Sequence, residues 1–469
     1  MDTVELSDSV SLGSGSEGEV DLLLKRANRH GLIAGATGTG KTATLQRLAE
    51  GLAKQGVPVF VCDVKGDLSG IAVGKDGSLN PALVWDVFGK SGHPLRTTVS
   101  EMGPLLLSRL LDLSEAQDGV LQICFRLADD RNLLLIDLKD LRALLEFVSD
   151  NAKEIGQEYG LVSPSSVAAI QRALLALEND GGAEFFGEPA LDLPDLMRVD
   201  GTGRGIISIL AADQLVRSPR LYSTVLLWLV AELFEDLPEA GDLDKPKLCL
   251  FFDEAHLLFN DASPVLQEKL EQAVRLIRSK GVGVYFITQS PLDIPPALAG
   301  QLGNRIQHAL RAFTPQDQKV VRAAADTFRA NPGFDTREAI TSLAVGEALV
   351  SLLDDSGAPT PVVRAKISLP DSRLGQLKAD EIARLKSLSP VAGRYEREVD
   401  RESAYEILSR KVETAPVPQQ QSQLPQPRRA PGRQAESLGM ALAKSAIRAA
   451  ANQIGREVMR GLFGSLRRW

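Results

Sequence analysis

Short apolar runs rich in Val, Ile and Phe recur along the chain, and each is followed by a turn or a polar segment. These runs predict strands at residues 31–36, 57–64, 205–210, 247–253 and 283–289. Helical spacing dominates the segments between them, including a long helix expected at residues 222–237. Alternation of this kind is typical of a mostly parallel sheet with helices on both faces, so we expect an α/β core.

Three stretches depart from this alternation. Residues 92–199 carry helical spacing with few strand signals, which predicts a helical insertion, and residues 371–411 predict a helical extension. Pro and Gln dominate residues 412–437, a composition that buries too little apolar surface to order itself and predicts a disordered linker. We therefore divide the chain into core parts at 1–91 and 200–370, the insertion, the extension, the linker, and a last segment at 438–469.

Residues 438–469 combine an apolar stripe with a basic face. Apolar side chains recur at steps of three and four, with Arg456, Arg460 and Arg467 on the opposite side, which predicts a basic amphipathic helix. The stripe consists of Ile447, Ala451, Ile454, Val458 and Leu462. Such a helix is expected to pack on the body or on another subunit, to lie on an anionic membrane, or to bind nucleic acid, and the alternative is that the segment is disordered.

Composition narrows the class of protein. Apolar residues make up 44% and charged residues 24%, which excludes a mainly disordered, collagen-like or coiled-coil chain. The net charge is −8; nine basic and three acidic residues from position 412 onward give +6, which leaves −14 for the rest. Because the body is acidic, any DNA contact must come from a local basic surface.

Three further features favour a cytoplasmic location. The start of the chain has no signal pattern, and no apolar run approaches the ~20 residues that span a bilayer. Cys62, Cys124 and Cys249 are far apart and show neither metal-ligand spacing nor a disulfide framework, which fits a reducing compartment.

A glycine-rich turn after the first predicted core strand fits the pattern G-x-x-x-x-G-K-[ST]. It consists of Gly35, Ala36, Thr37, Gly38, Thr39, Gly40, Lys41 and Thr42. Glycines let the backbone N–H groups point inward at phosphate oxygens, and the following helix adds the partial positive charge of its N-terminus. We expect Lys41 to reach the β- and γ-phosphates and Thr42 to ligate Mg²⁺. The turn is thus a predicted Walker A loop that binds ATP.

Two carboxylates end the strand at residues 247–253. In a doubly wound sheet this strand is expected beside the phosphate loop, where ligands bind at the carboxyl ends of strands. Asp253 would then hold the Mg²⁺ shell and Glu254 would polarise the attacking water as a general base. Acidic residues after strands are also common helix caps, but next to a Walker A loop the pair predicts a Walker B site. His256 would contact phosphate or simply begin the next helix.

Several polar residues are candidates to link hydrolysis to motion. Gln289 ends the strand at 283–289 and would lie between the γ-phosphate and Glu254, or would satisfy loop backbone. An arginine that enters a neighbour's site stabilises transition-state charge, although arginines on helix surfaces are more often solvated. The candidates for that role are Arg275, Arg278, Arg305 and Arg311. Residues 63–67 form either a polar turn or a support for the site.

Taken together, these motifs resemble the bacterial HerA-like helicase family, in the HerA/FtsK branch of P-loop ATPases. The matching stretches are residues 29–42, 59–70, 248–259, 275–291 and 301–317, and the resemblance covers most of residues 31–370. It implies a RecA-like core, ring-shaped hexamers, ATP hydrolysis between subunits and movement along double-stranded DNA. It also implies that the basic residue before the fourth core strand, Arg278, acts in trans, with Arg305 second. Relatives of this type usually carry an N-terminal β-barrel, for which the roughly thirty residues before the Walker A loop are too few.

The resulting hypothesis is an Mg²⁺-dependent ATPase that assembles as a homo-hexamer and translocates on or unwinds double-stranded DNA. One alternative is an ATPase of the same lineage that moves protein, as in secretion or pilus assembly. Another is a nucleotide-gated scaffold whose C-terminal helix recruits a partner protein or a membrane. DNA-stimulated turnover separates the first hypothesis from the other two.

Overall fold

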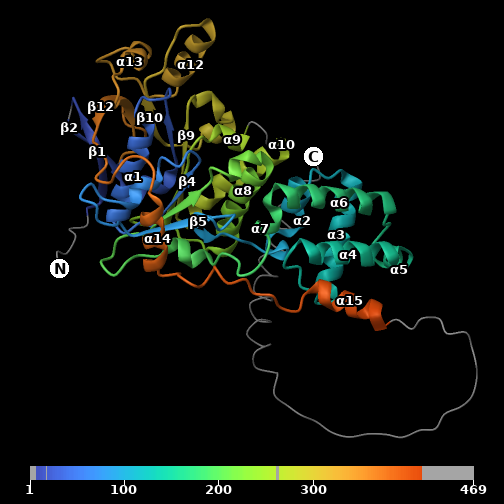
Figure 1. Cartoon of the computed structure of the whole chain (residues 1–469). Helices are drawn as coiled ribbons and strands as arrows, with labels where there is room; N and C mark the ends of the chain where they lie inside the picture. The colour runs from blue at the N-terminus through green and yellow to red at the C-terminus, as the bar shows by residue number, and fades with distance from the viewer. Residues whose placement is uncertain (1–6, 17, 260–263, 415–469) are drawn as a thin grey trace, which may run out of the picture.

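The computed structural model describes residues 7–16, 18–259 and 264–414 (Figure 1). Its strands are β1 (Ser9–Gly15), β2 (Gly18–Leu23), β3 (Gly31–Ala34), β4 (Val59–Asp63), β5 (Ala82–Asp86), β6 (His93–Pro94), β7 (Ile207–Ala211), β8 (Leu248–Phe252), β9 (Val282–Thr288), β10 (Asn304–His308), β11 (Glu347–Ser351) and β12 (Val363–Ile367). They form one twelve-stranded sheet in the order β2-β1-β12-β11-β10-β3-β9-β8-β4-β7-β5-β6. Every pair from β10 to β6 is parallel, and the other four pairs are antiparallel. The predicted mostly parallel α/β core is confirmed.

Helices cover both faces of this sheet. The α-helices of the described residues are α1 (Lys41–Lys54), α2 (Val99–Leu110), α3 (Glu115–Asp130), α4 (Leu138–Asp150), α5 (Ala152–Glu158), α6 (Pro164–Leu177), α7 (Ala183–Phe185), α8 (Pro219–Asp236), α9 (His256–Phe259), α10 (Pro264–Ile277), α11 (Pro296–Ala299), α12 (Pro315–Asp326), α13 (Thr336–Ser342), α14 (Ala379–Leu388) and α15 (Ala404–Thr414). Successive strand residues point to opposite faces, which divides the core in two. Leu248, Leu250 and Phe252 share one cluster with α8 and α10, whereas Cys249 and Phe251 share another with α1.

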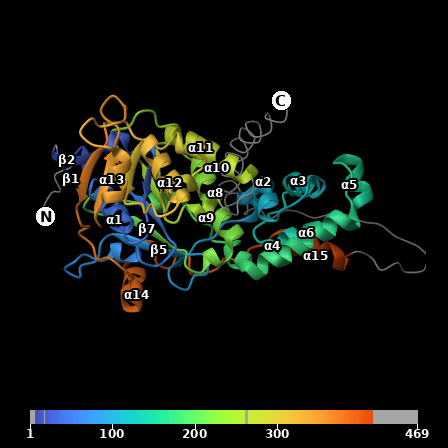
Figure 2. The same ribbon diagram turned by 90° about the horizontal axis from the view of Figure 1, so that it is seen from above.

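Helices α2 to α6 gather on one side of the sheet, as both views show (Figures 1 and 2). Apolar residues of α2, α3, α4 and α6 belong to the same core cluster as α8 and α10, so this helical segment packs continuously with the sheet. Helix α15 lies along α4, where the Tyr405 N–H donates to the Asp140 carboxylate at 2.9 Å. Residues 371–411 thus return to the helical segment from the far edge of the sheet.

The order of the central strands is more specific than our expectation. We expected the strand ending in Asp253 beside the phosphate loop; in the sheet this strand, β8, is separated from β3 by one strand, β9. Strands β1, β2, β5, β6 and β10 to β12 were not predicted. The order of parallel strands depends on how the connecting helices cross over the sheet. The periodicity of hydrophobic residues does not predict this order.

Some expectations fall outside the described residues. The linker at 412–437 lies there apart from the last residues of α15, and the amphipathic helix at 438–469 lies there entirely. Within the described part, no helix is long and apolar enough to cross a membrane. The three cysteines are buried free thiols.

Candidate functional site

The phosphate loop joins β3 to α1 and is fixed to the sheet by its own backbone. The Gly35 N–H donates to the Thr288 carbonyl of β9 at 3.3 Å, and the Ala36 N–H donates to the Ala309 carbonyl at 2.9 Å. A Cβ at position 35 would lie 2.5 Å from the His308 Cβ, and Gly40 adopts a left-handed φ of 114°. The glycines of the motif are therefore required by close packing and by backbone conformation.

Lys41 lies over this loop. Its Nζ donates to the Gly35 carbonyl at 2.7 Å and to the Ala36 carbonyl at 3.1 Å. Burial lowers the pKa of Lys41, with a further contribution from Lys65, whereas the charges of Glu254 and Asp253 oppose that change. Lys41 therefore lies at the phosphate loop and within range of the charges of both carboxylates.

Asp253 and Glu254 follow β8 at the carboxyl edge of the sheet, and both are buried. Glu254 has a left-handed φ of 47°, which is unusual for a residue other than glycine. Its carboxylate is ion-paired with Lys65, accepts a hydrogen bond from Gln289 Nε2 at 3.2 Å, and lies 3.3 Å from His256 Nδ1. The structure thus joins Glu254 and Gln289, which follow β8 and β9, and places Lys41, the first residue of α1, within range of the charge of Glu254.

The two carboxylates have different electrostatics. Burial and the adjacent charge of Glu254 raise the pKa of Asp253 to about 6. Burial also raises the pKa of Glu254, but the hydrogen bonds from Lys65 and Gln289 and the charge of Lys65 outweigh it, so this pKa lies below its ordinary value. Glu254 is thus held as a carboxylate at neutral pH.

The same residues fit Mg²⁺. A buried carboxylate with a raised pKa, such as Asp253, gains stability when a cation binds beside it. No group of three or more His, Cys, Asp or Glu side chains forms a metal cage within the described part of the chain. Mg²⁺ in nucleotide sites is held by one or two protein oxygens together with phosphates and water, and Asp253 is a buried carboxylate that could supply one of them.

The loop after β4 supports the site from a third direction. Asp63 is buried and accepts the N–H groups of Gly66 at 2.7 Å and Leu68 at 3.2 Å, which bends the loop. Burial and the nearby charge of Asp67 raise the pKa of Asp63 to about 7. The bend projects Lys65 toward Glu254, so residues 63–67 are both a polar turn and a support for the site.

His308 is a site residue that we did not predict. It is buried beside the phosphate loop, where its Nε2 lies 2.8 Å from Thr44 Oγ1 and its Nδ1 lies 2.9 Å from the Glu347 carbonyl. It therefore ties the first turn of α1 to β11. The contact between His308 and Thr44 joins residues 264 positions apart, so no local pattern in the sequence predicts it.

Three of the four candidate arginines lie away from this edge, whereas Arg311 follows β10 two residues after Ala309, whose carbonyl contacts the phosphate loop. Arg278 begins the 3₁₀ helix η6 (Arg278–Lys280) before β9, so it lies at the amino end of a strand whose carboxyl end carries Gln289. Arg275 and Arg311 are also exposed. Arg305 donates to the carbonyls of Leu302 at 3.2 Å and Ala299 at 2.7 Å. The structure does not bring Arg278 or Arg305 to the phosphate loop of its own subunit.

Comparison with known proteins identifies the family of the chain. The family model described as "Helicase HerA-like C-terminal" matches residues 10–469. The chain is 22% identical over 375 residues to a DNA double-strand break repair helicase HerA from Sulfolobus acidocaldarius, a match that covers 75% of this chain and 68% of the relative.

Solved structures show the same fold at low identity. The bacterial conjugative coupling protein TrwBdeltaN70 has a TM-score of 0.55 and 15% identity, covering 80% of this chain and 92% of its own. TrwB has also been solved with ADP and Mg²⁺, at a TM-score of 0.53 and 17% identity over 80% of this chain and 92% of its own. VirB4 of Thermoanaerobacter pseudethanolicus has a TM-score of 0.51 and 18% identity, covering 78% of this chain and 97% of its own.

These findings confirm the predicted RecA-like P-loop core. Since the family model matches nearly the whole sequence, the chain belongs to the helicase HerA-like C-terminal family and is an ATPase of that family.

Proposed function

We propose that this ATPase is a motor that translocates on double-stranded DNA as a homo-hexameric ring. The observation that carries the proposal is that the phosphate loop and Glu254, about two hundred positions apart in the chain, meet at the end of β9, where the Gly35 N–H donates to the Thr288 carbonyl and Gln289 donates to the Glu254 carboxylate. The relative from Sulfolobus acidocaldarius is named as a DNA repair helicase, and this chain spans about two thirds of its length. The DNA substrate is therefore part of the proposal.

Each side chain of the site has a role in hydrolysis that follows from its position. The N–H groups of the phosphate loop and Lys41 hold the β- and γ-phosphates. Thr42 and Asp253 would hold Mg²⁺, which neutralises charge that develops on the phosphates. Glu254 takes the proton of the attacking water, and Gln289, bonded to that carboxylate, senses whether the γ-phosphate is present.

Arg278 would complete the site of a neighbouring subunit. It is exposed and lies at the edge of the sheet opposite the phosphate loop, so it cannot serve its own nucleotide without leaving η6. In a ring that stacks one subunit's carboxyl edge on the next subunit's amino edge, that position faces the adjacent γ-phosphate. Arg305 is a weaker candidate because two backbone carbonyls already hold its guanidinium.

Turnover with and without DNA tests the proposal. We expect duplex DNA to stimulate ATP hydrolysis and to raise the particle mass measured with ATP and Mg²⁺ to that of a ring bound to DNA. Stimulation should fall steeply with added salt, because a motor that neutralises several phosphates releases their counterions. Turnover that is indifferent to DNA at every salt concentration would contradict DNA as the substrate. It would favour an ATPase that moves protein or a nucleotide-gated scaffold.

A further inference from the structure

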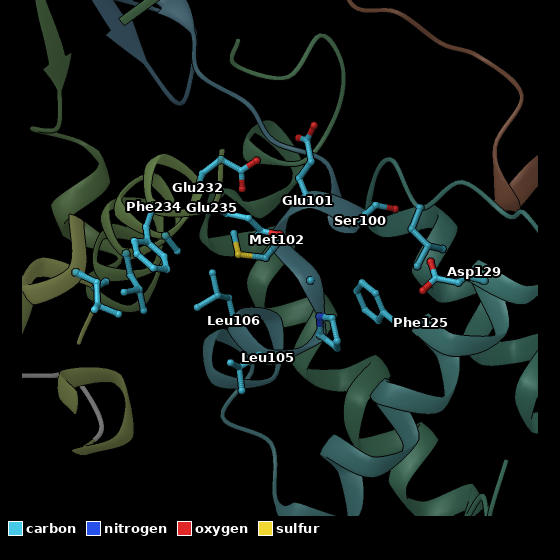
Figure 3. Close-up of a pocket in the computed structure, with 18 residues that line it drawn as sticks. Ser100, Glu101, Met102, Leu105, Leu106, Phe125, Asp129, Glu232, Phe234 and Glu235 are labelled. Carbon is cyan, nitrogen blue, oxygen red and sulfur yellow. The ribbon is translucent and has the colours of Figure 1, made fainter. Parts of the chain in front are cut away.

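A groove separates the helical segment from the helices that cover the core sheet. Its cavity holds about 160 Å³ and is lined by α2, α3, α8 and α10. Figure 3 shows Met102, Leu105 and Leu106 between Phe234 on one side and Phe125 on the other. Within α2, Gly103 departs from helical geometry with φ 70° and ψ 164° and is followed by Pro104, and both residues line the groove. The floor of the groove is therefore apolar.

The rim of this groove is acidic. Glu101, Glu232 and Glu235 lie along one edge and Asp129 lies near the other (Figure 3). No lysine or arginine is among the described residues that line it. We refer to this feature, an apolar floor bordered by four carboxylates, as the acidic groove. A matching ligand would present a narrow apolar stripe flanked by positive charge.

The chain contains one segment with that pattern. Residues 438–469 carry the apolar stripe that includes Ile454 and Val458, with Arg456 and Arg460 on the other face of the predicted helix. We propose that the acidic groove binds residues 438–469 of the same chain as an amphipathic helix, an interaction that goes beyond the proposed motor function. Apolar residues of the segment would cover the floor, and its arginines would reach the carboxylates of the rim.

Chain connectivity favours binding within one subunit. The last described helix, α15, ends at Thr414 on α4, and α4 belongs to the same helical segment as α2 and α3. The 23 residues at 415–437 reach up to about 75 Å when extended, so the tether does not limit access to the groove. A tether of this length gives the segment an effective concentration of the order of millimolar. A second copy of the chain has no such advantage.

Binding there would bear on the motor through α10. Ala273 and Leu276 of this helix line the groove, and the helix ends one residue before Arg278. A docked segment would hold α10 in place and with it the arginine. This consequence rests on the proposed role of Arg278, whereas the docking itself does not.

Cross-linking of the full chain tests the proposal without reference to ATP turnover. Leu276→Cys, on an exposed position of α10, and Ile454→Cys introduce two reactive thiols, while the three native cysteines are buried. A short bis-maleimide should join them within one chain. Mixing a Leu276→Cys chain with an Ile454→Cys chain of different mass should give little product. Products formed mainly between chains, or no product at all, would overturn the proposal.

Charge reversal makes the test specific to the groove. Glu232→Arg with Glu235→Arg should lower the yield about fivefold or more, since two rim pairs are lost. Glu154→Arg with Glu158→Arg, on the exposed face of α5, is the matched control and should leave the yield unchanged. Adding Arg456→Glu and Arg460→Glu to the rim variant should restore it. Equal yields in the rim and control variants, with all variants folded by circular dichroism, would contradict the assignment.

Discussion

Glu254 depends on its neighbours more than any other side chain of the site. Lys65 and Gln289 both bind its carboxylate, and its left-handed backbone is fixed where the Ala255 N–H donates to the Ile287 carbonyl at 2.8 Å. A general base must be unprotonated and correctly aimed, and these contacts provide both conditions.

Lys65→Met should therefore change the pH dependence of hydrolysis. The substitution removes the hydrogen bond and charge that lower the pKa of Glu254, so this pKa rises. Activity is lost when the base protonates, and we expect the acid limb of the kcat profile to move to higher pH. The measurement uses saturating Mg²⁺, so that Asp253 stays ionised. Lys75→Met, an exposed lysine, is the control, and a limb that stays in place in Lys65→Met would contradict the role of this contact.

Lys41→Ala should abolish turnover through loss of phosphate contact. We expect kcat/KM to fall on the order of 100-fold or more, the usual cost of removing a donor to transition-state charge. Lys54→Ala, at the other end of α1, should retain activity because its ion pair with Asp371 lies far from the nucleotide. Steady-state kinetics of the two variants measure the difference, and similar losses in both would contradict the assignment of Lys41.

His308 makes stability depend on pH. Burial lowers its pKa to about 4, against about 6.5 in the unfolded chain. Between these values only the unfolded state takes up the proton, so the contribution of His308 to stability declines as pH falls from about 6.5 toward 4. Denaturation of wild type and His308→Gln should show a stability difference about 2 kcal/mol smaller at pH 5 than at pH 7.5. A difference that is constant with pH would contradict a neutral His308.

At the scale of elements, the sheet determines which residues share the site. The strands β3, β9, β8 and β4 are parallel neighbours, so the loops that follow them meet at one edge. The element that precedes β9, η6 with Arg278, lies by the same logic at the opposite edge. If Arg278 takes part in hydrolysis, this position leads us to propose that it acts on another subunit.

Arg278→Ala tests that inference. Hydrolysis should fall about 1,000-fold or more while ATP binding persists, because trans arginines contribute mainly to the transition state. Mixing Arg278→Ala with Lys41→Ala chains should restore part of the activity, since each variant supplies the residue that the other lacks. Arg384→Ala, exposed on α14 and not a candidate for this role, is the control. Absence of rescue at every mixing ratio would contradict action in trans.

The sequence predicted individual strands and helices better than it predicted their order and pairing in the sheet. The apolar runs around β3, β4, β7, β8 and β9 and the helix α8 were predicted because a buried strand or helix has a local signature. The position of β9 between β3 and β8 depends on how the chain crosses over between strands, and the short polar strand β10 depends on pairing with its neighbours. Neither feature has a local signature in the sequence. His308 escaped prediction for the same reason, since its partners come from α1 and β11.

At the scale of the whole molecule, the distribution of charge links the body to its C-terminal segment. Residues before position 412 carry a net charge of −14, and those from 412 onward carry +6. Attraction between them favours docking within the chain, and it also places the basic residues where DNA would compete for them. Because the body is acidic, the DNA contact that we propose would require a locally basic surface.

The central claim is that Lys41, Asp253 and Glu254 act on one bound triphosphate, and the fate of ATP bound to Glu254→Gln tests it most directly. The variant keeps Lys41, Thr42 and Asp253, so it should bind Mg²⁺–ATP as wild type does. The nucleotide extracted from it after prolonged incubation should still be ATP. Recovery of ADP at the wild-type rate would contradict the account.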